Sequence, residues 1–166
     1  MAVLFMSSTG NLITHAHYFY KLPYANLVHS VFALAVDIRY GIKEAGLGFY
    51  EAIFNRVPGY WSVVVNNPQV TVLLPSKEAI ANASSKAELT DAEWTKILDY
   101  GTITTGFVGY TPKLEHNTTY RSRGGYFVVT WKAGEVYIND AKVIGRNNIL
   151  NNGVIQVLDK VRISLM

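Results

Sequence analysis

Candidate catalytic side chains are scattered along this sequence and form no cluster with an evident chemistry. His15 and His17 lie two residues apart, so on a strand they would share a face and could begin a metal site. No further histidine and no carboxylate cluster lies near them, which favours two polar aromatic residues in an N-terminal segment. His29 falls on an expected helix and His116 in a polar turn. We therefore expect no catalytic residues, no metal site and no cofactor.

Residue composition narrows the chemistry further. The chain of 166 residues contains no cysteine, which excludes disulfides, thiolate metal sites and a cysteine nucleophile. No serine lies in a nucleophile-elbow motif. The glycine pairs Gly46/Gly48 and Gly124/Gly125 lack the spacing and context of a phosphate-binding loop. The sequence thus predicts a protein that is not an enzyme.

Basic and aromatic side chains in the second half of the chain offer a binding chemistry instead. The net charge of +3 is too small for a nucleic-acid footprint. If several basic residues converge, they could bind an acidic polysaccharide or an acidic lipid surface, whereas ordinary solvated strands are the simpler interpretation. Neighbouring tyrosines could add stacking platforms, although strands favour tyrosine in any case. The predicted basic and aromatic face comprises Arg121, Arg123, Tyr126, Lys142, Lys160 and Arg162.

Two sequons give candidate glycosylation sites. They are Asn82-Ala83-Ser84 and Asn117-Thr118-Thr119, so the acceptors are Asn82 and Asn117. Both lie in expected surface loops or helix ends. They matter only if the protein enters the secretory pathway.

Hydrophobic periodicity places most helices in the first 100 residues. Apolar residues recur at helical spacing over residues 26–40, and a shorter helix is expected over 49–56. Ser76 can cap a helix over 77–83, and Thr90 with Glu93 matches a capping box before another helix. The β-branched run 61–65 and the apolar run 69–74 are expected to be extended or strands.

The period changes to two in the last 65 residues. Strands are expected over residues 102–107, 126–131, 135–138, 141–144 and 154–163, and residues 132–134 form a tight turn between two of them. Helices and strands that occupy separate parts of a chain are typical of an α+β fold. With 49% apolar and 16% charged residues, the chain has the composition of one folded domain.

The N-terminal residues and the uncharged stretches do not predict membrane insertion. The apolar start ends at Met6, which is short for a complete secretory signal. The stretches 22–36 and 57–76 contain prolines and polar residues, so we expect no transmembrane span.

Four segments resemble the fasciclin (FAS1) domain family. Residues 70–80, VTVLLPSKEAI, are similar to the first family signature, and residues 152–161, NGVIQVLDKV, are similar to the second. Between them, residues 136–143, VYINDAKV, resemble a family hairpin, and residues 97–100, ILDY, lie where members have a helix ending in a tyrosine and histidine. The family-motif positions are Thr71, Pro75, Ser76, Tyr100, Asn152, Gly153 and Asp159.

The resemblance implies a β-wedge of two sheets with several α-helices packed alongside. On this basis we expect residues 1–25 to be an N-terminal extension and residues 26–166 a single FAS1 domain. Gly153 suits a turn with positive φ, and Asp159 suits a carboxylate that accepts backbone hydrogen bonds. The chain departs from the family at Gly101 and Gln156, where a histidine is usual, so a matrix or integrin-like contact through the first of these regions is not expected.

The resemblance also implies a function. FAS1 domains generally act in adhesion, which suggests a non-catalytic module at the cell surface, in the extracellular matrix or in the vacuole. Expected partners are a protein, a polysaccharide or a lipid surface at the cell exterior, and the oligomeric state stays open. The alternative is an auxiliary or catalytic component of an oxidative secondary-metabolite pathway, as in some fungal members, which would need a pocket above roughly 300 Å³ for an aromatic molecule. A shortened form of a larger adhesion protein is a further alternative.

Overall fold

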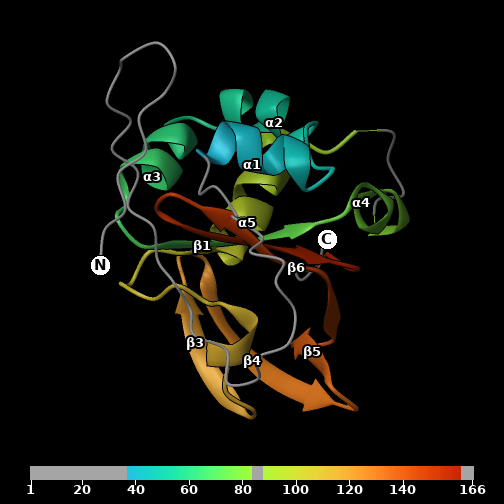
Figure 1. Cartoon of the computed structure of the whole chain (residues 1–166). Helices are drawn as coiled ribbons and strands as arrows, with labels where there is room; N and C mark the ends of the chain where they lie inside the picture. Colours follow the sequence, from blue (N-terminus) through green and yellow to red (C-terminus); the bar gives the residue numbers. More distant parts are fainter. Residues whose placement is uncertain (1–36, 84–87, 162–166) are drawn as a thin grey trace, which may run out of the picture. The chain divides into compact units, whose positions relative to one another are not determined.

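The computed structural model describes residues 37–83 and 88–161 of the chain, in which helices precede most of the strands (Figure 1). These described residues belong to one compact unit. The expected N-terminal extension, His15, His17, His29, Ser84 and Arg162 lie outside the described residues.

Five α-helices lie within the described ranges: α1 (Ile38–Glu44), α2 (Tyr50–Arg56), α3 (Tyr60–Asn66), α4 (Lys77–Ala83) and α5 (Asp91–Gly101). The helix expected over residues 26–40 begins only at Ile38 in the described part. Asp37 is extended, and its carboxylate accepts hydrogen bonds from the backbone N–H groups of Arg39 and Tyr40 at 2.7 and 3.2 Å. A residue that caps a helix in this way marks the helix N-terminus. Asp37 is therefore not inside a continuous helix, and α1 begins after it.

Helix α3 replaces the strand expected over residues 61–65, so that prediction is wrong. Gly59 has φ +74° and turns the chain into the helix. Tyr60 and Val64 lie four residues apart on one helical face, and both are buried in the core. At the other end, the Asn152 amide donates hydrogen bonds to the carbonyls of Val64 and Asn67, each at 2.8 Å. Packing and capping from distant residues therefore override the strand preference of a valine-rich run.

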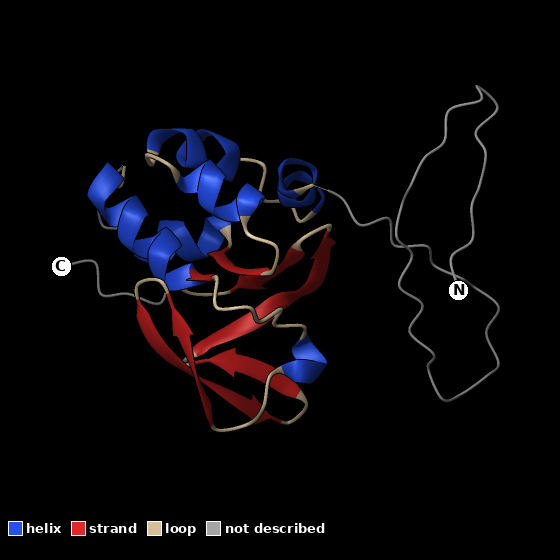
Figure 2. Ribbon diagram, turned by 90° about the vertical axis from the view of Figure 1, so that its left-hand side faces the viewer, coloured by secondary structure: helices blue, strands red, loops and turns tan. Residues whose placement is uncertain are grey.

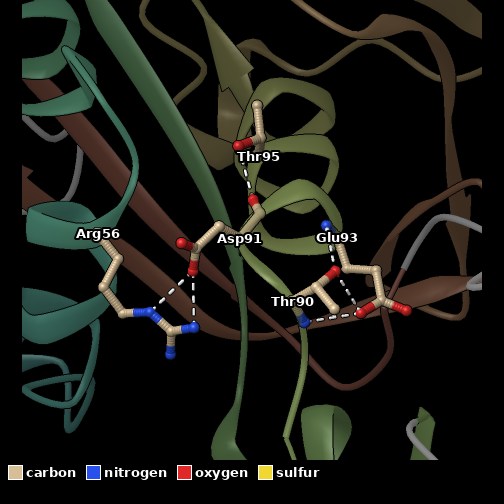
Figure 3. Close-up of polar contacts among 5 residues, drawn as sticks. All are labelled: Arg56, Thr90, Asp91, Glu93 and Thr95. Carbon is tan, nitrogen blue, oxygen red and sulfur yellow. Dashed lines mark hydrogen bonds and ion pairs between the residues drawn. The ribbon is translucent and has the colours of Figure 1, made fainter.

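Helix α5 begins with the expected capping box, which is confirmed (Figure 3). The Thr90 N–H donates to the Glu93 carboxylate at 2.7 Å, and the Glu93 N–H donates to the Thr90 hydroxyl at 3.3 Å. Beside it, the Arg56 guanidinium of α2 pairs with the Asp91 carboxylate at 2.6 Å. Both members of this ion pair are about half exposed, so we expect it to add at most about 1 kcal/mol.

The strands form a seven-stranded sheet in the order β2-β1-β7-β6-β5-β4-β3. Strand β1 pairs in parallel with β7, and every other neighbouring pair is antiparallel. A short 3₁₀ helix spans Thr111–Lys113. The strands are β1 (Val70–Pro75), β2 (Thr102–Ile103), β3 (Thr118–Ser122), β4 (Gly125–Lys132), β5 (Glu135–Ile138), β6 (Ala141–Leu150) and β7 (Gly153–Leu158).

The expected wedge of two sheets is corrected to one continuous sheet, because β6 is longer than its expected range. Its first residues, Ala141 and Lys142, pair with β5, and its residues from Val143 to Leu150 pair with β7. The register with β7 shifts on both sides of Gly145, and Asn147 has φ +56°. Bulges of this kind let a strand bend while it stays paired, so β6 joins the two halves of the sheet. In contrast, the strands expected over 102–107 and 154–163 end early in the described residues, at Ile103 and Leu158.

Strands β1 and β7 are buried along their whole length and separate two hydrophobic cores. Val72, Val157 and their neighbours pack against the helices, which lie on one side of the strands in Figure 2. Leu73 and Leu158 instead pack with Phe127 and other residues of β4–β6. Period-two alternation sends successive side chains to opposite faces, so one pair of central strands serves both cores.

Two buried tyrosines tie the helical core to the sheet. The Tyr50 hydroxyl donates to the Pro75 carbonyl at 3.0 Å. The Tyr60 hydroxyl lies 2.6 Å from the Thr102 hydroxyl, which donates to the Leu98 carbonyl at 2.6 Å, so Tyr60 is the donor of this pair. Burial raises the pKa of both phenols well above the ordinary value of 10.

These tyrosines predict a loss of stability in alkali. Above pH 10 the unfolded tyrosines ionise while the folded ones stay neutral, so each lowers the free energy of unfolding by about 1.4 kcal/mol per pH unit. The Tyr60→Phe variant should show a shallower decline than the wild type in urea unfolding between pH 9 and 11. Tyr126→Phe, at a tyrosine 66% exposed, is the control. Equal declines in the wild type and Tyr60→Phe would rule out this explanation.

Candidate functional site

The histidine and carboxylate chemistry considered from the sequence is not assembled in the described part of the chain. Residues 37–83 and 88–161 contain no group of three metal-ligating side chains. His116 is exposed as expected, and its Nδ1 accepts a hydrogen bond from the Trp131 backbone N–H at 2.9 Å. Over the same ranges, no helix has the length and apolar character needed to cross a bilayer.

One side of strands β3–β6 faces away from the core that contains Phe127 and Leu158. This side carries the polar and aromatic side chains. Along β4, Phe127 and Val129 are buried, whereas Tyr126 and Val128, which alternate with them, are exposed. The same alternation continues on the neighbouring strands. We call this surface the outer face, and its residues are Thr119, Arg121, Tyr126, Val128, Thr130, Lys132, Glu135, Tyr137 and Lys142, with Arg146 at its margin.

Strand register places cationic and aromatic side chains of the outer face next to one another. Arg121 of β3 lies directly opposite Tyr126 of β4. Tyr137 of β5 lies opposite Lys142 of β6. Directly opposite residues on one face have Cβ atoms about 5 Å apart, so each pair forms a continuous surface. The structure thus brings together three residues of the predicted basic and aromatic face: Arg121, Tyr126 and Lys142.

The outer face carries an excess of positive charge. Glu135 is shared by two cations, with Lys142 Nζ at 3.6 Å and the Arg146 guanidinium in direct contact. Lys132 Nζ lies 5.3 Å from the centroid of the Tyr137 ring. Arg121 makes no ion pair or hydrogen bond with any side chain that the structure describes. Three cations, Lys132, Lys142 and Arg146, therefore lie near one carboxylate, whereas Arg121 lies at the other end of the face. Neither Arg121 nor Lys132 forms an ion pair with a described residue, although Lys132 lies opposite Glu135 in the strand register.

Two other predicted members of this face, Arg123 and Lys160, lie elsewhere, and Arg162 is outside the described residues. Arg123 is in the β3–β4 turn, where its Nε pairs with the Asp99 carboxylate of α5 at 2.9 Å. Lys160 follows β7 and pairs with Asp140 at 3.3 Å. Both charges are offset by partners that lie far away in the sequence.

Lys132, Tyr137 and Arg146 belong to the basic and aromatic residues of the second half of the chain, and strand alternation predicts the position of two of them. Lys132 has the same parity as Tyr126 along β4, so it lies on the same face. The turn at Ala133 and Gly134, with φ +50° and +79°, brings β5 back in register and places Tyr137 on that face as well. Arg146 follows an irregularity in β6, which simple alternation does not predict.

Side chains at family-motif positions form hydrogen bonds that stabilise the fold. The Thr71 hydroxyl donates to the Phe107 carbonyl and accepts from the Gly109 N–H, at 3.0 and 2.7 Å. Ser76 caps α4 as expected, since its hydroxyl accepts from the Ala79 N–H at 3.1 Å. The Asp159 carboxylate accepts a hydrogen bond from the Lys142 N–H at 2.7 Å, which confirms its expected role.

Three glycines near motif positions are required for close packing. The expected positive φ at Gly153 is wrong, because Gly153 is not among the residues with positive φ. A Cβ at this position would instead lie 1.8 Å from the Val70 carbonyl oxygen. Tyr100 lies under the Gly124–Gly125 turn, where a Cβ at either glycine would come within 2.9 Å of it.

Gln156, which stands where the family has a histidine, is fully buried. Its amide N–H groups donate to the Gly109 carbonyl at 2.8 Å and the Asn147 side-chain oxygen at 2.9 Å. Its carbonyl accepts from the Asn147 N–H at 2.8 Å. The same Asn147 oxygen accepts two hydrogen bonds from Thr111. This network fixes the bend of β6, and it offers no group to solvent.

Both sequon asparagines are exposed. Asn117 has φ +57° and lies in the turn just before β3, with Thr119 also exposed. Asn82 lies in the last turn of α4. Each acceptor is therefore accessible in the described part of the structure.

Comparison with known proteins identifies similarity to one family. Residues 57–163 match the family model of the Fasciclin domain. The fold resembles a solved FAS1 domain pair from the insect cell adhesion molecule fasciclin I, with a TM-score of 0.57 and 20% sequence identity. The match covers 72% of this chain and 45% of that one, so the chain spans less than half of the domain pair. No curated protein matches the sequence.

Proposed function

The chain belongs to the fasciclin domain family, and from this premise we propose that it is a non-catalytic adhesion module that binds through the outer face of β3–β6. Domains of this family are typically adhesion or binding modules. The observation that carries the proposal is the outer face itself, where cations that form no ion pair with a described residue lie on the same face as exposed tyrosine and valine side chains.

The exposed apolar residues support a contact surface. Tyr126 is 66% exposed and Val128 38% exposed, and they lie two residues apart on β4. Ile144 of β6 is 52% exposed. Tyrosine and arginine are enriched at the centres of protein interfaces because they combine a large contact area with hydrogen bonding.

The alternative function, binding of an aromatic small molecule, draws less support from the arrangement of the aromatic residues. The Phe54 ring contacts the rings of Tyr60 and Trp61, with centroids 4.6 and 5.1 Å away. Tyr50 packs against Phe54 and Trp94 in the same cluster. The hydroxyls of Tyr50 and Tyr60 bond to other protein groups. These rings pack in or against the helical core, and both tyrosine hydroxyls are already hydrogen-bonded.

We place the protein in the secretory pathway, as a secreted, cell-surface or vacuolar protein. The family and the two exposed sequons support this location. Labelling of intact and permeabilised cells of the source organism, followed by glycosidase treatment, tests it. A cytosolic product without glycan on Asn82 and Asn117 would contradict it.

A cell-attachment assay tests the adhesive role. Surfaces coated with the full chain should retain cells of the source organism, and Tyr126→Ala should reduce attachment by half or more because it removes the most exposed ring of the outer face. Tyr40→Ala is a matched control, since Tyr40 is 55% exposed on α1. Attachment no greater than to an albumin-coated surface, or an equal loss with Tyr40→Ala, would refute the proposal.

A further inference from the structure

The outer face has the charge and side chains to recognise one class of polymer. Arg121 and Lys132 form no ion pair in the described structure, although Lys132 lies opposite Glu135, and Lys142 and Arg146 share the single carboxylate of Glu135. The face therefore carries more positive charge than its own acidic groups can offset. A ligand that covers it gains most if it supplies several negative charges.

The cations are distributed in a way that suits an extended ligand. Arg121 lies on β3 and Lys142 on β6, three strands apart, which is roughly 14 Å at the usual spacing between strands. Lys132 lies six residues along β4 from Tyr126, which is about 20 Å. A single small anion could contact only one end of this surface, whereas a chain could contact several cations at once.

The groups between the cations suit sugar rings. Tyr126 and Tyr137 present aromatic rings, and the exposed Thr119 contributes a hydroxyl. Aromatic rings pack against the apolar faces of sugars, and hydroxyls exchange hydrogen bonds with them.

From this arrangement we infer that the outer face binds a linear acidic polysaccharide, carrying carboxylate or sulfate groups, across strands β3–β6. The inference rests on the proposed binding role and names its ligand class. An extended acidic peptide fits less well, because the backbone groups of β4 and β5 are used within the sheet and cannot pair with it. A membrane fits less well because the exposed apolar residues are few: Tyr126 and Val128 on the outer face, and Ile144 further along β6.

Binding of the purified full chain to defined polymers tests the inference. The probes are heparin and polygalacturonate as acidic polysaccharides, dextran as a neutral one, polyglutamate as an acidic peptide, and vesicles of phosphatidylcholine with phosphatidylserine. We expect both acidic polysaccharides to bind, dextran not to bind, and polyglutamate and vesicles to bind at least tenfold more weakly. The affinity should fall as salt rises, because screening weakens contacts between exposed charges.

A charge-matched pair of variants locates the site. Arg121→Gln with Lys132→Gln removes the two cations of the face that form no ion pair with a described residue, and it should weaken binding of both acidic polysaccharides about tenfold. Lys77→Gln with Lys96→Gln removes the same charge from exposed positions on α4 and α5 and should change affinity less than about twofold. Both doubles alter exposed side chains, and circular dichroism with urea unfolding verifies their folding.

Each outcome either supports or overturns the inference. Failure of both acidic polysaccharides to bind, equal losses in the two double variants, or tighter binding of polyglutamate or vesicles would overturn it. The cell-attachment assay separates this failure from failure of the proposed function. Attachment that depends on Tyr126, without polysaccharide binding, would leave the adhesive role intact and remove only the ligand class.

Discussion

Replacing Gly153 with alanine is expected to destabilise the protein by about 4 kcal/mol or more, enough to unfold a domain of ordinary stability. Gly153 lies opposite Val70 in the parallel pair β1–β7, which separates the two cores. An alanine Cβ would lie 1.8 Å from the Val70 carbonyl oxygen and 2.7 Å from its carbon. Both contacts are with backbone, so relief requires β1 and β7 to separate.

A glycine in open surroundings gives the matched control for this prediction. At Gly48 a Cβ would meet only the flexible side chain of Lys43, at 3.7 Å, and Gly48 is not among the glycines with positive φ. Gly48→Ala should therefore change the free energy of unfolding by less than about 1 kcal/mol in either direction. Urea unfolding of both variants provides the measurement. A Gly153→Ala protein as stable as Gly48→Ala would show that β1 and β7 do not approach as closely as described.

The sequence predicted the elements whose ends are set by their own neighbouring residues. The capping box at Thr90 and Glu93 and the turn at residues 132–134 both formed as expected. In each case the interacting groups lie within four residues of one another, so local pattern contains the needed information. The family motif at Asp159 was also interpreted correctly, because it accepts one backbone N–H as expected.

The predictions from the sequence were wrong where contacts with distant residues determine the structure. The run 61–65 has strand propensity, yet it is helical because Val64 packs in the core and Asn152 binds the carbonyls at the helix end. Strand β6 extends past residue 144 because Gln156 and Asn147 hold its bend. Neither of these long-range contacts produces a periodic pattern in the sequence.

The candidate face was partly predictable, because part of it depends only on local alternation and on a short turn. Alternation along β4 and pairing across the turn suffice to put Tyr126, Lys132 and Tyr137 on one side of the sheet. Which cations stay unpaired was not predictable. Asp99 of α5 pairs with Arg123, whereas Arg121, two residues away, has no such partner in the described structure.

Substitution of Gln156 should give the other large loss of stability, because its side chain is fully buried and every polar atom is used. Gln156→Leu leaves the Gly109 carbonyl and the Asn147 N–H without this partner in the interior. Each buried group left unpaired costs about 1–3 kcal/mol. We expect a loss of about 3 kcal/mol in urea unfolding, independent of pH between 4 and 7.

Gln156→Glu should behave differently, because its stability should depend on pH. A carboxylate at this position would face two acceptors, the Gly109 carbonyl and the Asn147 side-chain oxygen, in a buried site. Both burial and these acceptors disfavour the charged form, so the pKa of the new carboxyl is raised in the folded state above its unfolded value of about 4.3. A protonated carboxyl can still donate to one acceptor and accept from the Asn147 N–H.

The Gln156→Glu variant should therefore be closest to the wild type at pH 4. It should lose about 1.4 kcal/mol relative to the wild type for each pH unit above 4.3, up to the folded pKa. A deficit that stays constant from pH 4 to 7, like that of Gln156→Leu, would mean that the carboxylate reaches solvent and that the network does not hold β6 closed.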